Sequence, residues 1–265
     1  MPADRSQKAA WRKADRLARI AVAAGLADRD PETSGEMLIP LLDDLHASRK
    51  APRGLAALLA RFAELLPAAA DTGHPYEARL NELKDAGLAY ADKNGPETWL
   101  PETVLVHALL RIGAGEDPGR QLDWLTRDLA NRGPEHFPTA ALAVVHAARG
   151  DVEAARRVAE QPSAPWTRAA ALAAVAGHLA RVPVRPVPGT HPGQTDPLTR
   201  AVQHLALTSS PYTSADTQAV TGFLHQALDT DGWYHALPVL AQIEPDAVAR
   251  VRDTALVHVR AAAGS

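Results

Sequence analysis

Residues 139–180 read TAALAVVHAARGDVEAARRVAEQPSAPWTRAAALAAVAGHLA, and this stretch decides the fold. Alanine, the strongest helix former, dominates it. Gly150 is suited to end one helix in a left-handed conformation, and Asp151 to cap the next. The small side chains of Ala154 and Ala155 let two helices pack closely. The stretch therefore predicts a helical hairpin followed by a third helix that opens at Pro165.

The same helical periodicity extends over the rest of the chain. Alternating runs of β-branched and aromatic residues, which are typical of strands, are nearly missing. Short segments with Pro, Gly or Asp separate about thirteen predicted helices. The sequence therefore predicts an all-α fold, with helices at 6–28, 33–48, 51–70, 75–93, 96–114, 118–132, 135–149, 151–161, 165–181, 195–209, 214–229, 231–243 and 245–262.

Four tryptophans suggest that the helices repeat. Trp11, Trp99, Trp166 and Trp233 each open a predicted helix, at intervals of 88, 67 and 67 residues. An interval of 67 is about twice the length of a helix-pair repeat of 33 or 34 residues. The spacing predicts a helix-hairpin solenoid in which tryptophan rings, Trp99 and Trp166 above all, fill grooves between successive helix pairs.

The stretch 139–180 resembles a tetratricopeptide-type (TPR-like) unit. Residues 151–179, with Pro165, Trp166 and Leu172, also look like the degenerate helical repeats of bacterial scaffold proteins and of the sensor arms of STAND-type NTPases. The chain departs from that pattern at Ala159, where an aromatic residue usually packs the second helix. The resemblance implies a TPR-like or HEAT-like solenoid that binds other proteins. The high Arg and Ala content, with only five lysines, is typical of a high-GC bacterium.

A proline-rich segment divides the chain. Residues 181–200 hold five prolines and two glycines, which exclude helix from most of the segment and favour a loop or linker, or a docking arm over the concave face. We therefore predict a helical-repeat region at 1–180 and another at 201–265. Since repeats contact only their neighbours, residues 1–180 are expected to fold alone.

Composition and motifs exclude several function classes. The chain has no cysteine, which rules out disulfides, thiolate nucleophiles and Cys-ligated metals. A net charge of −3 disfavours nucleic-acid binding. Nucleotide-loop, zincin and α/β-hydrolase signatures are missing, and so are an apolar leader and a membrane-spanning run. We expect a cytoplasmic protein without a cofactor or metal.

Two sets of polar residues leave an enzyme function open as an alternative. Asp43 and Asp44, followed by His46, form an adjacent acid pair, but neighbouring helix positions point about 100° apart, so a solvated helix face is favoured over a magnesium-dependent cyclase site. His225 and Asp229 lie one helical turn apart and are interpreted as a surface pair. His107, His146, His178 and His258 interrupt apolar helices and are interpreted as buried, hydrogen-bonded histidines.

The candidate partner-binding residues are Trp233, Tyr234 and His235, together with His225. They gather aromatic and imidazole groups at a turn, in a chain with only 5% aromatic residues. Exposed aromatics are enriched in interface hot spots. The sequence therefore predicts a scaffold that binds a peptide or a partner protein, with self-association as a further option. The alternatives are a regulatory sensor subunit of a separately encoded NTPase or kinase, and an all-α enzyme with a closed cavity.

Overall fold

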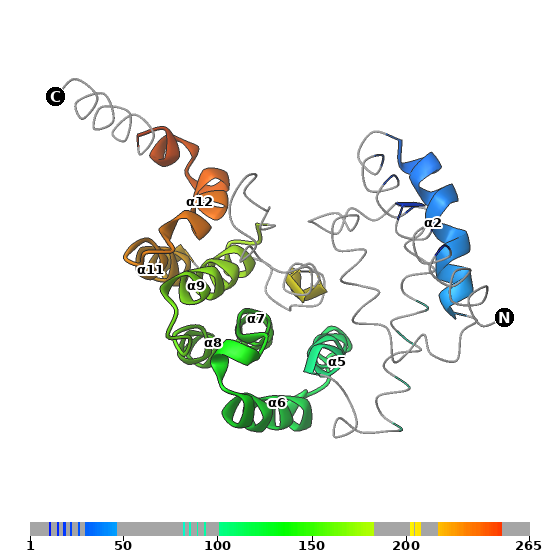
Figure 1. The fold of residues 1–265 in the computed structure, drawn as a ribbon, viewed down its shortest axis with the longest axis horizontal. Coiled ribbons are helices and arrows are strands. Elements are labelled where there is room, and N and C mark those ends of the chain that lie inside the picture. The colour runs from blue at the N-terminus through cyan, green and yellow to red at the C-terminus, as the bar shows by residue number, and fades with distance from the viewer. Residues whose placement is uncertain are drawn as a thin grey trace.

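In the computed structural model of the chain, all the secondary structure of the described residues is helical (Figure 1). It describes residues 30–46, 101–182, 202–203, 205–207 and 217–250, with single helical positions at 11, 15, 18, 19, 22, 26, 82, 85, 89 and 93. The elements are α2 (Pro31–His46), α5 (Pro101–Gly113), α6 (Gly119–Arg132), η2 (Pro134–His136), α7 (Thr139–Arg149), α8 (Val152–Ala159), α9 (Pro165–Leu179), α11 (Thr217–Leu228), η3 (Trp233–His235) and α12 (Leu237–Ile243). The predicted all-α class is confirmed.

Most predicted helix ends lie within a few residues of the observed ones. Two predicted helices are interrupted instead. The span 135–149 divides into η2 and α7, and the span 231–243 divides into η3 and α12. Phe137 has extended backbone angles at the first break. The predicted helices at 51–70 and most of 6–28 and 75–93 lie outside the described residues, so the number thirteen stays a prediction.

The hairpin of α7 and α8 forms through the local signals read from the sequence. Gly150 has φ 96° and ψ 5°, the left-handed conformation that ends α7. The Asp151 carboxylate accepts a hydrogen bond of 2.9 Å from the backbone N–H of Ala154 and so caps α8. Ala155 and Ala159 are fully buried. A small residue therefore fills the position where the resemblance expects an aromatic one.

Three helix pairs follow one another in the described part of the chain. α5 packs on α6, α7 on α8, and α9 on α11. Figure 1 shows α5, α7 and α9 along the inner side of an arc, with α6, α8 and α11 along its outer side. α7 also packs on both α5 and α9. The inner helices therefore form a continuous layer.

The third pair joins helices that are not neighbours in the sequence. α9 packs most extensively on α11. Residues 202–207 instead lie inside the arc (Figure 1), where Val202, Leu205 and Ala206 are fully buried. The proline-rich segment thus comes between the two helices of one pair in chain order. Residues 183–200 themselves lie outside the described residues.

Polar contacts fix residues 202–207 to α9 and to the segment just after it. The Gln203 side-chain amide donates a hydrogen bond of 3.1 Å to the carbonyl oxygen of Ala174 in α9. The Arg181 guanidinium donates one of 2.6 Å to the carbonyl oxygen of Leu207. These contacts reach across the proposed boundary at 181–200. The division into 1–180 and 201–265 stays a prediction.

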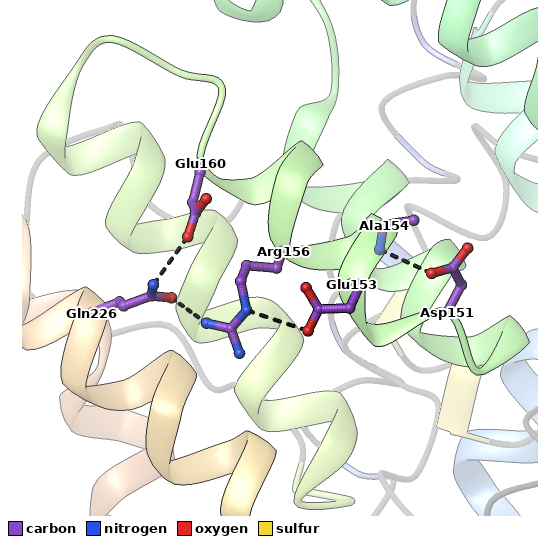
Figure 2. Close-up of polar contacts among 6 residues, drawn as sticks. All are labelled: Asp151, Glu153, Ala154, Arg156, Glu160 and Gln226. Atoms are coloured by element: carbon purple, nitrogen blue, oxygen red, sulfur yellow. Dashed lines mark hydrogen bonds and ion pairs between the residues drawn. The ribbon is translucent and has the colours of Figure 1, made fainter.

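Arg156 links α8 to α11 across 70 residues of sequence. Its Nη1 donates a hydrogen bond of 2.7 Å to the side-chain oxygen of Gln226, and its guanidinium lies 4.4 Å from the centre of the Phe223 ring. Gln226 in turn donates to the Glu160 carboxylate at 2.9 Å (Figure 2). Phe223 is fully buried beneath this network. The buried ring and the hydrogen bonds together fix the position of α11 against α8.

Three histidines are buried in the inner helices. His107 in α5, His146 in α7 and His178 in α9 each have little or no exposed surface. Burial lowers the pKa of His107 and of His178 to about 4, because an imidazolium loses its hydration there, and Arg181 adds to the effect on His178. The predicted burial is confirmed for these three, and His258 lies outside the described residues. The predicted hydrogen bonding is wrong for Nδ1 of His146 and of His178, which have no partner among the described residues.

The lowered pKa values predict that acid weakens the fold. In the unfolded chain these histidines become protonated below pH 6.5, whereas buried His107 and His178 become protonated only near pH 4. The free energy of unfolding therefore falls as the pH is lowered from 6.5 to 4. Each histidine adds a slope of about 1 kcal/mol per pH unit. Urea unfolding followed by circular dichroism at pH 7 and pH 5 measures the loss. His178→Leu should make the loss smaller, and the exposed-site control His136→Gln should not. An unchanged pH dependence in His178→Leu contradicts the assignment.

Candidate functional site

The start of α9 is held by a carboxylate from another part of the chain. The Glu135 side chain in η2 accepts hydrogen bonds from Ser163, at 2.7 Å from its backbone N–H and 2.8 Å from its hydroxyl. It also accepts one of 3.3 Å from the N–H of Ala164. These Ser163 bonds, the largest cause, lower the pKa of the Glu135 carboxyl. The residues just before α9 are therefore fixed in place.

Trp166 stands on this fixed first turn and is 53% exposed. The prediction that its ring fills a groove between helix pairs is wrong, because more than half of the residue's surface is exposed. Trp99 lies outside the described residues. Trp11 is 72% exposed, so the two helix-opening tryptophans at the repeat positions 11 and 166 both face outward.

A tight turn after α11 reaches the same place. The Trp233 N–H donates a hydrogen bond of 3.1 Å to the carbonyl oxygen of Thr230, and the Thr230 hydroxyl donates one of 2.8 Å to that of Ala227. Gly232, inside the turn, packs against α9. A Cβ on Gly232 would lie 2.6 Å from Cα of Trp166 and 2.8 Å from Cβ of Ala169. Only glycine fits there without moving backbone.

This close approach brings Trp233 next to the start of α9. Trp233 is 44% exposed, and its ring meets the half-buried ring of Tyr234 edge-on, with centroids 6.3 Å apart and planes at 77°. We call Trp166, Trp233 and Tyr234 the aromatic surface. It joins segments that are 67 residues apart in the sequence, and packed backbone supports both of them.

The predicted partner-binding residues divide into exposed and buried ones. Trp233 and Tyr234 belong to the aromatic surface. His235 is buried, with its ring 4.5 Å from that of Tyr234, and burial lowers its pKa. His225 and Asp229 are exposed at the end of α11, joined by a backbone hydrogen bond of 3.0 Å. The sequence analysis missed Trp166 as a partner-binding residue. The available signal was that Trp166 lies 67 residues before Trp233, the same interval that separates it from Trp99.

The acid pair that suggested a magnesium-dependent enzyme belongs to α2. Asp43 is exposed on α2, and the side chains of Asp44 and His46 lie outside the described residues. Within the described ranges, no group of three or more His, Asp and Glu side chains is arranged to hold a metal ion. In the same ranges, no helix is long and apolar enough to cross a membrane.

Comparisons of the chain with protein-family models, with curated proteins and with solved structures find no match.

The Gly232 contact predicts a selective steric defect. Gly232→Ala places a methyl group against the backbone of α9, so we expect a loss of about 1–3 kcal/mol in the free energy of unfolding. The control is Gly222→Ala in α11, where the new Cβ meets only the flexible end of Arg156 at 3.6 Å and helix propensity favours alanine. Chemical denaturation should show destabilisation only for Gly232→Ala. Equal stability of the two variants contradicts the packing.

Proposed function

We propose that this chain is a protein–protein interaction or scaffold module of TPR-like or HEAT-like character, and that the aromatic surface is where a peptide or partner protein binds. The observation that carries the proposal is the exposure of Trp166 and Trp233, which stand on segments that Gly232 packs tightly against each other. The cytoplasmic location expected from the sequence stays a prediction.

The energetics favour binding at such a surface. Covering apolar area contributes about 25 cal/mol for each Å² removed from water, and tryptophan is among the residues most enriched in hot spots. Glu135 and Gly232 already hold the two segments in position. A partner therefore loses little of its binding free energy to ordering this surface.

The inner side of the arc is a poorer candidate for the binding site. A solenoid often binds its partner on the concave face. Here residues 202–207 lie inside the arc and bury Val202, Leu205 and Ala206. Because the chain covers this side of α9 itself, the exposed aromatic surface at the start of α9 is the better candidate. No described residue favours the regulatory-subunit or enzyme alternatives.

The proposal predicts a partner that depends on both rings. In native mass spectrometry of the tagged full chain captured from a lysate of its source organism, we expect a defined protein partner or a second copy. Trp166→Ala with Trp233→Ala should weaken that complex at least ~30-fold, the scale of one hot-spot residue at about 2 kcal/mol.

The matched control is Trp11→Ala, which removes an even more exposed tryptophan from another part of the chain. It should leave the complex intact. Circular dichroism confirms that each variant folds. A complex that survives the double substitution, or that Trp11→Ala disrupts equally, overturns the aromatic surface as the binding site.

A further inference from the structure

The charge of the chain is unevenly distributed around the aromatic surface. The whole chain has 28 Lys and Arg against 31 Asp and Glu. Residues 201–249, which supply α11, η3 and α12, have no Lys or Arg at all. The same residues carry five acids: Asp216, Asp229, Asp231, Glu244 and Asp246. The near-neutral total therefore hides an acidic segment.

Two of these acids lie on the turn that builds the aromatic surface. Asp231 is inside the turn from Thr230 to Trp233, directly before the Gly232 that touches α9. Asp229 precedes the turn at the end of α11. Both side chains are exposed. The position of Gly232 against Trp166 thus brings together the chain segments that carry two carboxylates and two indole rings.

Arginines that contact α11 or follow α12 are engaged with other partners, and Arg168 on α9 projects away from Trp166. Arg156 bonds to Gln226 and lies over the Phe223 ring. Arg250 forms an ion pair of 2.9 Å with Glu244. Arg168 follows Trp166 by two positions, so it projects about 200° around α9 from that ring. Among the residues that the structure describes, neither Asp229 nor Asp231 forms an ion pair.

We propose that the aromatic surface binds a Lys- or Arg-bearing segment of a partner protein. The cationic heads would meet the carboxylates of Asp229 and Asp231, and their apolar stems and charged ends would lie on the faces of Trp166 and Trp233. Aromatic faces attract cations, and carboxylates bind guanidinium through paired hydrogen bonds. The same acidic charge repels a phosphate backbone. This inference rests on the proposed function and names the chemistry of its partner.

The test uses the full chain and the indole N–H signals of its five tryptophans. Single Trp→Phe variants assign the signals in ¹⁵N-labelled protein. The probes are acetyl-tetraarginine amide and acetyl-tetraglutamate amide. We expect the signals of Trp166 and Trp233 to shift saturably with tetraarginine only, more weakly as salt is raised.

Matched charge variants separate a local site from general attraction. Asp229→Asn with Asp231→Asn should weaken tetraarginine binding at least ~tenfold, a local effect of paired charges. Asp123→Asn with Glu36→Gln changes the net charge by the same amount at exposed positions on α6 and α2, and it should change the affinity less than twofold.

Several results overturn the inference. They are equal shifts with both probes, no shift at Trp166 and Trp233 with tetraarginine, and equal weakening by the two charge variants. If a captured partner still needs both tryptophans, the proposed function survives and only the inference of a Lys- or Arg-bearing ligand fails. A partner indifferent to the tryptophans would remove the proposed function itself, whatever tetraarginine does.

Discussion

The rest of the structure depends on covering α9. Ten of its residues are buried, from Ala169 to Leu179 with only Ala170 partly exposed, so apolar side chains face outward all around the helix. A helix of this kind must be surrounded by other elements. α7, α8, α11, η3 and residues 202–207 together surround it. In its first turn, the side chain of Trp166 stays exposed.

Local signals predicted the parts of the fold that local physics decides. Gly150 and Asp151 marked the α7–α8 junction, because a left-handed glycine and a capping carboxylate act within one turn of the chain. The pairing of α9 with α11 was not predictable in this way. Ala-rich helices present similar faces to any neighbour, so the sequence alone favours packing between helices that are adjacent in the chain. The long-range contacts of Arg156, Phe223 and Gly232 decide the pairing.

The same distinction explains the site. Trp233 and Tyr234 were recognisable as aromatic residues at a turn. The exposure of Trp166 was not recognisable, because the local sequence around a tryptophan at a helix start does not show whether another helix covers the ring. Its place beside Trp233 follows from Gly232 packing on α9. The absence of Lys and Arg from 201–249 becomes informative only when that contact brings the acids to the rings.

The central claim is that α9 joins the hairpin α7–α8 and α11 into one cooperative unit. Native-state hydrogen exchange of the wild type and of Phe223→Ala tests it most directly. Removing the fully buried Phe223 ring costs about 3–5 kcal/mol. In one cooperative unit, the most protected amides of α7, α9 and α11 all lose the same protection. Faster exchange in α11 alone, with α7 and α9 unchanged, would contradict it.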